Sequence, residues 1–193
     1  MKITAIKTFI TPSTGNFFVK VETDEGIYGL GEAGVRRRGT AITEVIRSFS
    51  PDIIGQNPFC IEHLWQVMFR GGFFPGGVVQ SAAVSAVDIA LWDIKGKALG
   101  VPVYELLGGR TRDKVVCYPH IGARQHLESL VAECKERKKE GWRFVRWGLS
   151  DPKGQDLLEP SRTVRFGIEQ VKTVREELGD EIEICFDVHT RLD

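Results

Sequence analysis

The alternation of apolar and polar residues changes along the chain and divides it into two regions. From residue 1 to 113, segments with the two-residue period of strands come first, and segments with helical spacing follow. From residue 114 to 193, strand-like and helix-like segments alternate. We therefore expect an α+β domain over 1–113 and a domain of repeating βα units over 114–193.

The first region is predicted to begin as a three-stranded antiparallel meander followed by helices. The expected strands lie at 3–10, 17–22 and 27–31. The expected helices lie at 40–49, 61–69 and 81–99. Pro51 should end the first helix, and Gly100 with Pro102 should end the third, which we expect to bury one face.

The second region is predicted to contain two consecutive βαβ units with right-handed crossovers. The expected strands lie at 115–121, 144–149 and 182–187. The expected helices lie at 125–140 and 161–178, with Ser161 as the N-cap of the second. The predicted buried stripe of that helix is Val164, Ile168, Val171, Val174 and Leu178.

Composition excludes several classes of partner. Lys and Arg total 26 and Asp and Glu total 26, so a zero net charge argues against nucleic-acid binding. No segment approaches the ~18 apolar residues of a membrane span, and Met1–Ile10 lacks the features of a signal peptide, so we expect no membrane partner and a cytoplasmic protein. The four cysteines are widely spaced and are expected to be reduced, buried and without a chemical role.

Candidate chemistry gathers at the predicted strand ends, where reactive groups collect in parallel α/β folds. Asp187 and His189 lie two residues apart, so on an extended segment they can face one cavity; the alternative is a surface carboxylate beside a solvated histidine. Arg146 points either into this site or outward between helices. His120 is either a site residue or an ordinary core or rim histidine.

Two further segments carry possible binding groups. The run Arg36–Arg38 is either a solvated turn or a holder of an anionic substrate. In the segment 71–77, glycines surround Phe73, Phe74 and Pro75, which predicts a mobile loop with an aromatic tip. A phosphate-cradling role for this loop is disfavoured, because it lacks both G-x-G-x-x-G and a Lys-Ser/Thr ending.

Residues 83–108, AVSAVDIALWDIKGKALGVPVYELLG, resemble the mandelate racemase and muconate-lactonizing enzyme signature of the enolase superfamily. The segments KITAIK, DEGIYGLGE and FDVHTRL resemble that superfamily's acid-sugar dehydratases of the galactonate and mannonate type. The resemblance implies an α+β capping domain followed by the first three strands and two helices of a TIM-type barrel, in the N-terminal portion of a longer protein. It also implies a homo-oligomer.

The chemistry implied by the resemblance is dehydration of a small-molecule sugar acid through an enediolate, with Mg²⁺ stabilising the negative charge. Asp187 would be a metal ligand and His189 the general acid. Arg146 would be an electrostatic or substrate-positioning group. His120 and Arg36 would contact substrate, and the loops at 11–16, 34–39 and 71–77 would shape the pocket.

Three features of the sequence bear on the implied dehydratase activity. Arg146-Trp147-Gly148 stands where racemases carry K-x-K, which disfavours a racemase or cycloisomerase. The tyrosine expected of mannonate-type members is absent between Leu149 and Ser161, so the sugar acid stays open. A complete barrel takes about 250 residues, so further metal ligands and the base would come from later strands. The alternative is a non-catalytic fragment or scaffold that pairs with another polypeptide.

Overall fold

The computed structural model describes residues 1–74, 76–151, 157–189 and 192. The chain forms two compact units, Met1–Thr111 and Arg112–Asp193. Among the described residues, no helix combines the length and the apolar character needed to cross a membrane. The predicted loop at 71–77 has no helix or strand at its described positions, and Pro75 lies outside them.

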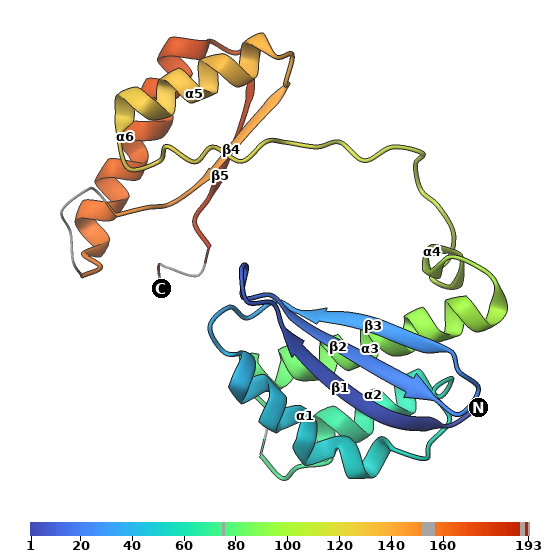
Figure 1. Cartoon of the computed structure of the whole chain (residues 1–193). Coiled ribbons are helices and arrows are strands. Elements are labelled where there is room, and N and C mark those ends of the chain that lie inside the picture. Colours follow the sequence, from blue (N-terminus) through green and yellow to red (C-terminus); the bar gives the residue numbers. More distant parts are fainter. Residues whose placement is uncertain (75, 152–156, 190–191, 193) are drawn as a thin grey trace. The chain divides into compact units, whose positions relative to one another are not determined.

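The first unit begins with the predicted antiparallel meander. Strands β1 (Ile3–Ile10), β2 (Phe17–Thr23) and β3 (Tyr28–Ala33) form a sheet in the order β1-β2-β3 (Figure 1). Phe17, Val19 and Val21 alternate with less buried residues along β2, so the two-residue period predicted the inward face correctly.

Helices cover one face of this sheet (Figure 1). They are α1 (Gly39–Ile53), α2 (Ile61–Arg70) and α3 (Val78–Leu99). The short helix α4 (Val103–Leu106) follows α3 and packs against it. Helix α3 packs against β2 and β3 and also against α1 and α2, so it is buried on more than the single face expected. Helix α1 continues past Pro51, because the Ile54 N–H still donates to the Ser50 carbonyl at 3.0 Å and closes the last turn.

The contact between β3 and α3 depends on small residues. A Cβ atom at Gly29 would lie 1.9 Å from the Ala90 carbonyl oxygen, and one at Gly31 would lie 1.9 Å from the Ala86 carbonyl oxygen. Glycine on the strand and alanine on the helix therefore bring the two backbones into direct contact. Asp93 reinforces the contact, because its carboxylate accepts the Leu30 N–H at 2.9 Å.

The second unit contains a pair of parallel strands and two helices. The elements are α5 (Leu127–Lys139), β4 (Phe144–Gly148), α6 (Pro160–Leu178) and β5 (Glu183–Asp187). Strands β4 and β5 are in parallel register, with Arg146 opposite Cys185 and Gly148 opposite Asp187. The core of the unit is formed by Ile121, Leu130, Cys134, Val145, Trp147, Val174, Leu178 and Ile182.

The strand expected over 115–121 does not form, so two of the three predicted barrel strands are present among the described residues. Within 115–121, only His120 pairs with β4, through an isolated parallel bridge to Arg146. Pro119 has no N–H to donate to a ladder, and Val115 and Val116 are both exposed, without the alternate burial of a strand. The apolar composition of the segment suggested a strand. In this unit, however, the segment lacks a neighbouring face on which a strand would pack.

The buried face of α6 is also different from the predicted one. The helix begins one residue earlier, with Glu159 as N-cap and Pro160 in its first turn, so Ser161 is not the cap. Its buried residues are Thr163, Gly167, Gln170, Val174 and Leu178. Ile168, which we expected to be buried, is 63% exposed. Part of the apolar stripe of α6 therefore faces solvent in this unit.

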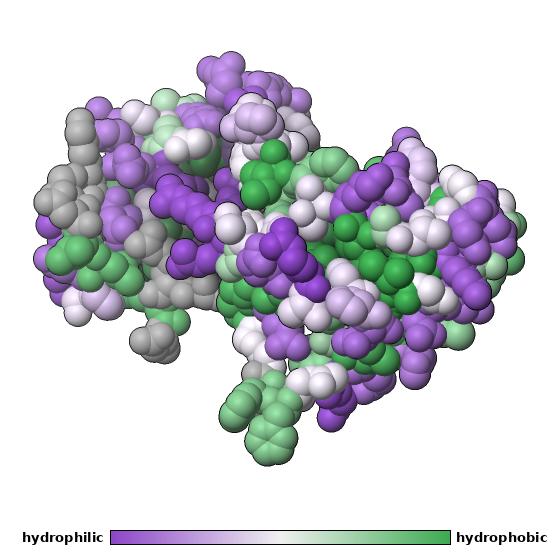
Figure 2. Space-filling model, turned by 60° about the horizontal axis from the view of Figure 1, so that its bottom comes forward, coloured by the Kyte–Doolittle hydropathy of each residue, from purple (hydrophilic) through white to green (hydrophobic). Residues whose placement is uncertain are grey.

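Apolar side chains also emerge elsewhere on the surface, between polar ones (Figure 2). Phe73 and Phe74 in the glycine-rich loop are 95% and 79% exposed, and their rings meet edge to face at 5.3 Å. The aromatic tip predicted for this loop is thus present at its described positions.

Candidate active site

The carboxyl ends of β4 and β5 bring the predicted site residues of the second unit together. Arg146 is on β4, and Asp187 is the last residue of β5. His120 joins them through its bridge to Arg146, and His189 follows β5 by two residues. Four of the five candidate site residues predicted from the sequence therefore lie together at the carboxyl end of the strand pair.

Arg146 is the centre of this cluster. Its side chain is only 11% exposed, and its Nη1 lies 2.9 Å from Nδ1 of His120. Its Nη2 donates a hydrogen bond to the Asp187 carboxylate and lies 3.5 Å from Nε2 of His189. Of the two orientations that the sequence left open, the structure adopts the one that points into the site.

Asp187 is held in its ionised form. The backbone N–H of His189 donates to Oδ1 of Asp187 at 2.7 Å, and this bond, together with the Arg146 guanidinium, lowers the pKa of the carboxyl below its ordinary value. Partial burial acts in the opposite direction and is outweighed. A charged oxygen ligand is therefore available at the strand end.

His189 reaches the site through a turn. Strand β5 ends at Asp187, and His189 has a positive φ of 55°, which is uncommon for a residue with a side chain. Its Nδ1 lies 3.1 Å from Oδ1 of Asp187. The predicted pairing of Asp187 with His189 is confirmed, although the predicted cause, alternation along an extended strand, is wrong.

Arg146, Asp187 and His189 line a cavity of about 380 Å³, whereas His120 contacts Arg146 from outside this lining. Tyr118 and Cys185, which the sequence analysis did not select, line it as well. Each lies two residues before a site residue, Tyr118 before His120 and Cys185 before Asp187. The two-residue spacing along β5 could have identified Cys185, whereas Tyr118 lies in a segment that does not form a strand.

The fit of a magnesium ion to this site is partial. A carboxylate that is ionised, about one-third exposed and at a strand end is a suitable oxygen ligand for Mg²⁺. Among the described residues, no group of three or more His, Cys, Asp or Glu side chains is arranged to hold a metal ion. Asp187 thus fits as one ligand, and the described part of the chain does not complete a coordination shell.

Arg36 lies in the first unit, apart from the other four residues in the chain. It is exposed and lines a cavity of about 370 Å³ between the hairpin turn at 11–16 and the segment that precedes α1. Arg37, Thr14 and Thr40 line the same cavity. Two of the three loops expected to shape a pocket, those at 11–16 and 34–39, therefore meet within this unit.

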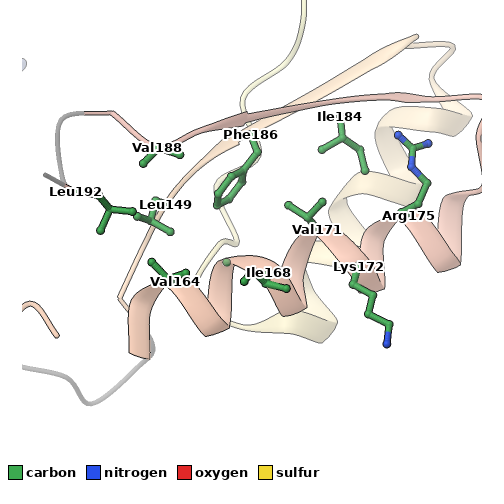
Figure 3. Close-up of a pocket in the computed structure, with 11 residues that line it drawn as sticks. Leu149, Val164, Ile168, Val171, Lys172, Arg175, Ile184, Phe186, Val188 and Leu192 are labelled. Carbon is green, nitrogen blue, oxygen red and sulfur yellow. The ribbon is translucent and has the colours of Figure 1, made fainter. Parts of the chain in front are cut away.

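A larger cavity in the second unit is apolar and separate from the strand-end chemistry. It measures about 630 Å³ and lies between β5 and the exposed stripe of α6. Phe186 and Ile184 point from the strand toward Val164, Ile168 and Val171 on the helix (Figure 3). Its lining offers packing surface rather than convergent polar groups, so we do not place the active site there.

Comparison with known proteins agrees with this architecture. Residues 4–108 match the family model described as mandelate racemase/muconate lactonizing enzyme, N-terminal domain. D-galactonate dehydratase of Pectobacterium atrosepticum is 40% identical over 193 residues, which are 100% of this chain and 50% of the relative. D-galactonate dehydratase of Verminephrobacter eiseniae is 38% identical over 192 residues, covering 100% of this chain and 49% of the relative.

A solved structure shows the same similarity. The crystal structure of an enolase from Pantoea ananatis with bound D-gluconate and magnesium has a TM-score of 0.83 and 30% sequence identity. The match covers 100% of this chain and 54% of that one. The chain spans about half the length of the curated relatives that it matches.

The meander with its covering helices is the α+β capping domain of the enolase superfamily. Because the family model matches more than half of the residues, the chain belongs to the mandelate racemase/muconate lactonizing enzyme family.

Proposed function

We propose that the chain is part of a Mg²⁺-dependent dehydratase that removes water from a sugar acid. The observation that carries this proposal is the cluster of Arg146, Asp187 and His189 at the ends of adjacent parallel strands. The galactonate dehydratases among its relatives, and the gluconate and magnesium bound to the Pantoea protein, support this substrate class.

The proposed reaction is a β-elimination. The proton on the carbon beside the carboxylate is removed, the hydroxyl on the next carbon departs with a proton as water, and the resulting enol tautomerises to a 2-keto-3-deoxy acid. Mg²⁺ would stabilise the negative charge that builds up on the carboxylate oxygens. The base that takes the first proton is expected from later strands of a longer protein.

The residues of this chain have distinct roles in the proposal. His189 donates the proton to the departing hydroxyl, and Asp187 is one metal ligand. Arg146 contributes positive charge and fixes the positions of His120 and Asp187 by hydrogen bonding to both. His120 and Arg36 contact the substrate.

The proposed fold of the second unit is the beginning of a TIM-type barrel. Strands β4 and β5 are parallel, and helix α6 connects them. The partly exposed stripe of α6 and the apolar cavity beside β5 are the surfaces that a following βα unit would cover. Self-association of the whole protein stays a prediction, which sedimentation velocity would test.

The direct test is an assay of a protein extended to the length of the relatives. We expect D-galactonate or a related acid, with Mg²⁺, to yield a 2-keto acid, and His189→Asn to lower kcat by about 10²–10⁴ because the proton donor is lost. Asp187→Asn should weaken Mg²⁺ binding measured by calorimetry. His126→Asn, at an exposed histidine outside the cavity, is the control. Unchanged turnover in His189→Asn would refute the assigned acid.

A second candidate is a non-catalytic scaffold that pairs with another polypeptide. The partly exposed apolar surface of α6 and β5 favours it, because such surfaces mark interaction sites. Turnover by the extended protein would exclude this candidate. A stable complex with a second polypeptide, together with absent turnover, would favour it over the dehydratase.

A further inference from the structure

The backbone that carries His120 has little support on its N-terminal side. Residues 115–118 form no strand and are exposed. His120 meets β4 through the isolated bridge to Arg146, in which the Ile121 N–H donates to the Arg146 carbonyl at 2.9 Å. A single bridge restrains a segment less than a continuous ladder does, so the position of His120 depends on what holds the residues after it.

Glu133 of α5 holds those residues. Its Oε2 accepts the Gly122 N–H and the Ala123 N–H, each at 3.0 Å. Hydrogen bonds to a carboxylate are about twice as strong as those between neutral groups. The side chain of Glu133 is 24% exposed, so these bonds are partly shielded from water. One carboxylate thus fixes two successive peptide groups within three residues of His120.

Gln170 of α6 fixes the end of the same segment, at Arg124. It is fully buried and uses both ends of its side-chain amide. Its Nε2 donates to the Arg124 carbonyl, and its Oε1 accepts the indole N–H of Trp147 at 3.3 Å. The segment 121–124 is therefore attached to β4 at both ends, and Glu133 holds the two peptide groups in between.

His120 and Arg146 hold one another at the strand ends. Nδ1 of His120 accepts a hydrogen bond from Nη1 of Arg146 at 2.9 Å, and Nη2 of the same guanidinium donates to the Asp187 carboxylate. Because the guanidinium is planar and rigid, a displaced imidazole would leave Nη1 without this partner and would allow Nη2 to leave Asp187. The backbone after His120 therefore affects a group that lines the strand-end cavity.

We infer that Glu133 is a positioning residue of the candidate active site. It fixes the backbone after His120, so that the imidazole meets Arg146 and Arg146 meets Asp187. Glu133 does not line the strand-end cavity, so it acts through His120 rather than by contact with a ligand. The positioning of His120 stands on these contacts. Its effect on substrate binding rests on the proposed dehydratase function.

The imidazole of His120 reports this positioning in the 193-residue chain. Nitrogen-15 NMR, at a pH where His120 is neutral, should show the hydrogen on Nε2 in the unmodified chain, because Nδ1 is the acceptor. Glu133→Ala should give a mixture of the two tautomers, since the imidazole is no longer held against Arg146. Hydrogen exchange of the Ala123 amide should become at least about tenfold faster.

Two further variants separate the reach of the side chain from its charge. Glu133→Asp keeps the charge but is one methylene shorter, so it should give the mixture of tautomers that Glu133→Ala gives. Glu133→Gln loses the charge but keeps an oxygen that can accept both N–H groups, so it should restore the single tautomer. This pair decides the inference even if circular dichroism shows that Glu133→Ala does not fold.

Glu136→Ala is the matched control, because it removes an exposed carboxylate from the same helix. It should leave the His120 signals unchanged. A single Nε2–H tautomer in both Glu133→Ala and Glu133→Asp would overturn the inference. A mixture in Glu133→Gln together with a single tautomer in Glu133→Asp would also overturn it, because the charge rather than the hydrogen bonds would then be responsible.

The consequence for the reaction is tested separately, in a protein extended to the length of the relatives. Glu133→Ala should raise KM for the sugar acid about tenfold and lower kcat by less, because a displaced Arg146 weakens a contact that forms when the substrate binds. Glu133→Gln should restore both. Unchanged KM and kcat in Glu133→Ala would overturn the effect on substrate binding. Absence of turnover in the unmodified protein would instead refute the dehydratase, and the tautomers of His120 would still decide the positioning.

Discussion

Arg146 donates a hydrogen bond from Nη1 to Nδ1 of His120 across 2.9 Å. Since Nδ1 is the acceptor, the neutral imidazole carries its hydrogen on Nε2. Arginine therefore selects the tautomer of its neighbour, and His120 offers an N–H donor at its other nitrogen. A hydroxyl-rich substrate would meet a donor there.

This relationship predicts a defined tautomer in solution. Nitrogen-15 NMR of the chain, at a pH where His120 is neutral, should show the Nε2–H form. Arg146→Lys should allow both tautomers, because an ammonium lacks the planar fork that reaches His120 and Asp187 together. The signals of His126, which is exposed and outside the cavity, should not change. An Nδ1–H form in the unmodified chain would contradict the hydrogen bond.

The ionised carboxylate of Asp187 should stabilise the folded chain at neutral pH, and this stabilisation should be lost in acid. Its pKa is lowered in the folded chain, so its contribution is fully present above its unfolded value of about 3.9 and is lost as the pH falls through the folded value. Urea unfolding in EDTA should therefore show the advantage of the unmodified chain over Asp187→Asn shrinking below about pH 4. An advantage that is constant from neutral to strongly acidic pH would refute this linkage.

Gly31→Ala should lower the free energy of unfolding of the first unit by at least about 1–3 kcal/mol, because the new methyl group would clash with the Ala86 carbonyl oxygen. Gly34→Ala is the matched control, since nothing lies within 4 Å of a Cβ atom there. Thermal unfolding followed by circular dichroism compares the two. Equal stability of both variants would mean that β3 and α3 are not in direct backbone contact.

The cysteines should differ sharply in reactivity. Burial raises the pKa of the Cys134 thiol to about 12. Cys60 and Cys117 are exposed, so the expectation that all four cysteines are buried is wrong for these two. Brief treatment with a thiol reagent near pH 8 should label Cys60 and Cys117 and leave Cys134 unmodified, as read by peptide mass spectrometry. Labelling of Cys134 should require denaturant; fast labelling without it would contradict its burial.

The exposed stripe of α6 gives a test of the proposed barrel. Ile168→Lys should change the unfolding free energy of the 193-residue chain by less than about 0.5 kcal/mol, because the side chain is 63% exposed. In a protein extended to the length of its relatives, the same substitution should cost several times more, as a charge would then be buried. Equal small effects in both proteins would mean that no following unit covers this stripe.

Local patterns predicted most of the secondary structure, because alternation and helical spacing report which residues face a core. The same patterns failed where a core face was missing. Val115 and Val116 look like a strand but lie exposed, and the stripe at Ile168 looks buried but faces solvent. For the site, strand-end position brought Asp187 and His189 together correctly. The side chain of Arg146 could not be oriented from sequence, because its direction depends on the bridge that His120 makes with β4.

The glycine–alanine contact between β3 and α3 has a mechanical consequence for Arg36 and Arg37. Because no side chain separates the two backbones, β3 cannot tilt or slide without carrying α3 with it. Arg36 and Arg37 follow β3 within a few residues, so the segment that bears them starts from a stiff support. Movement of the two arginines would then be confined to the short stretch between Ala33 and Gly39.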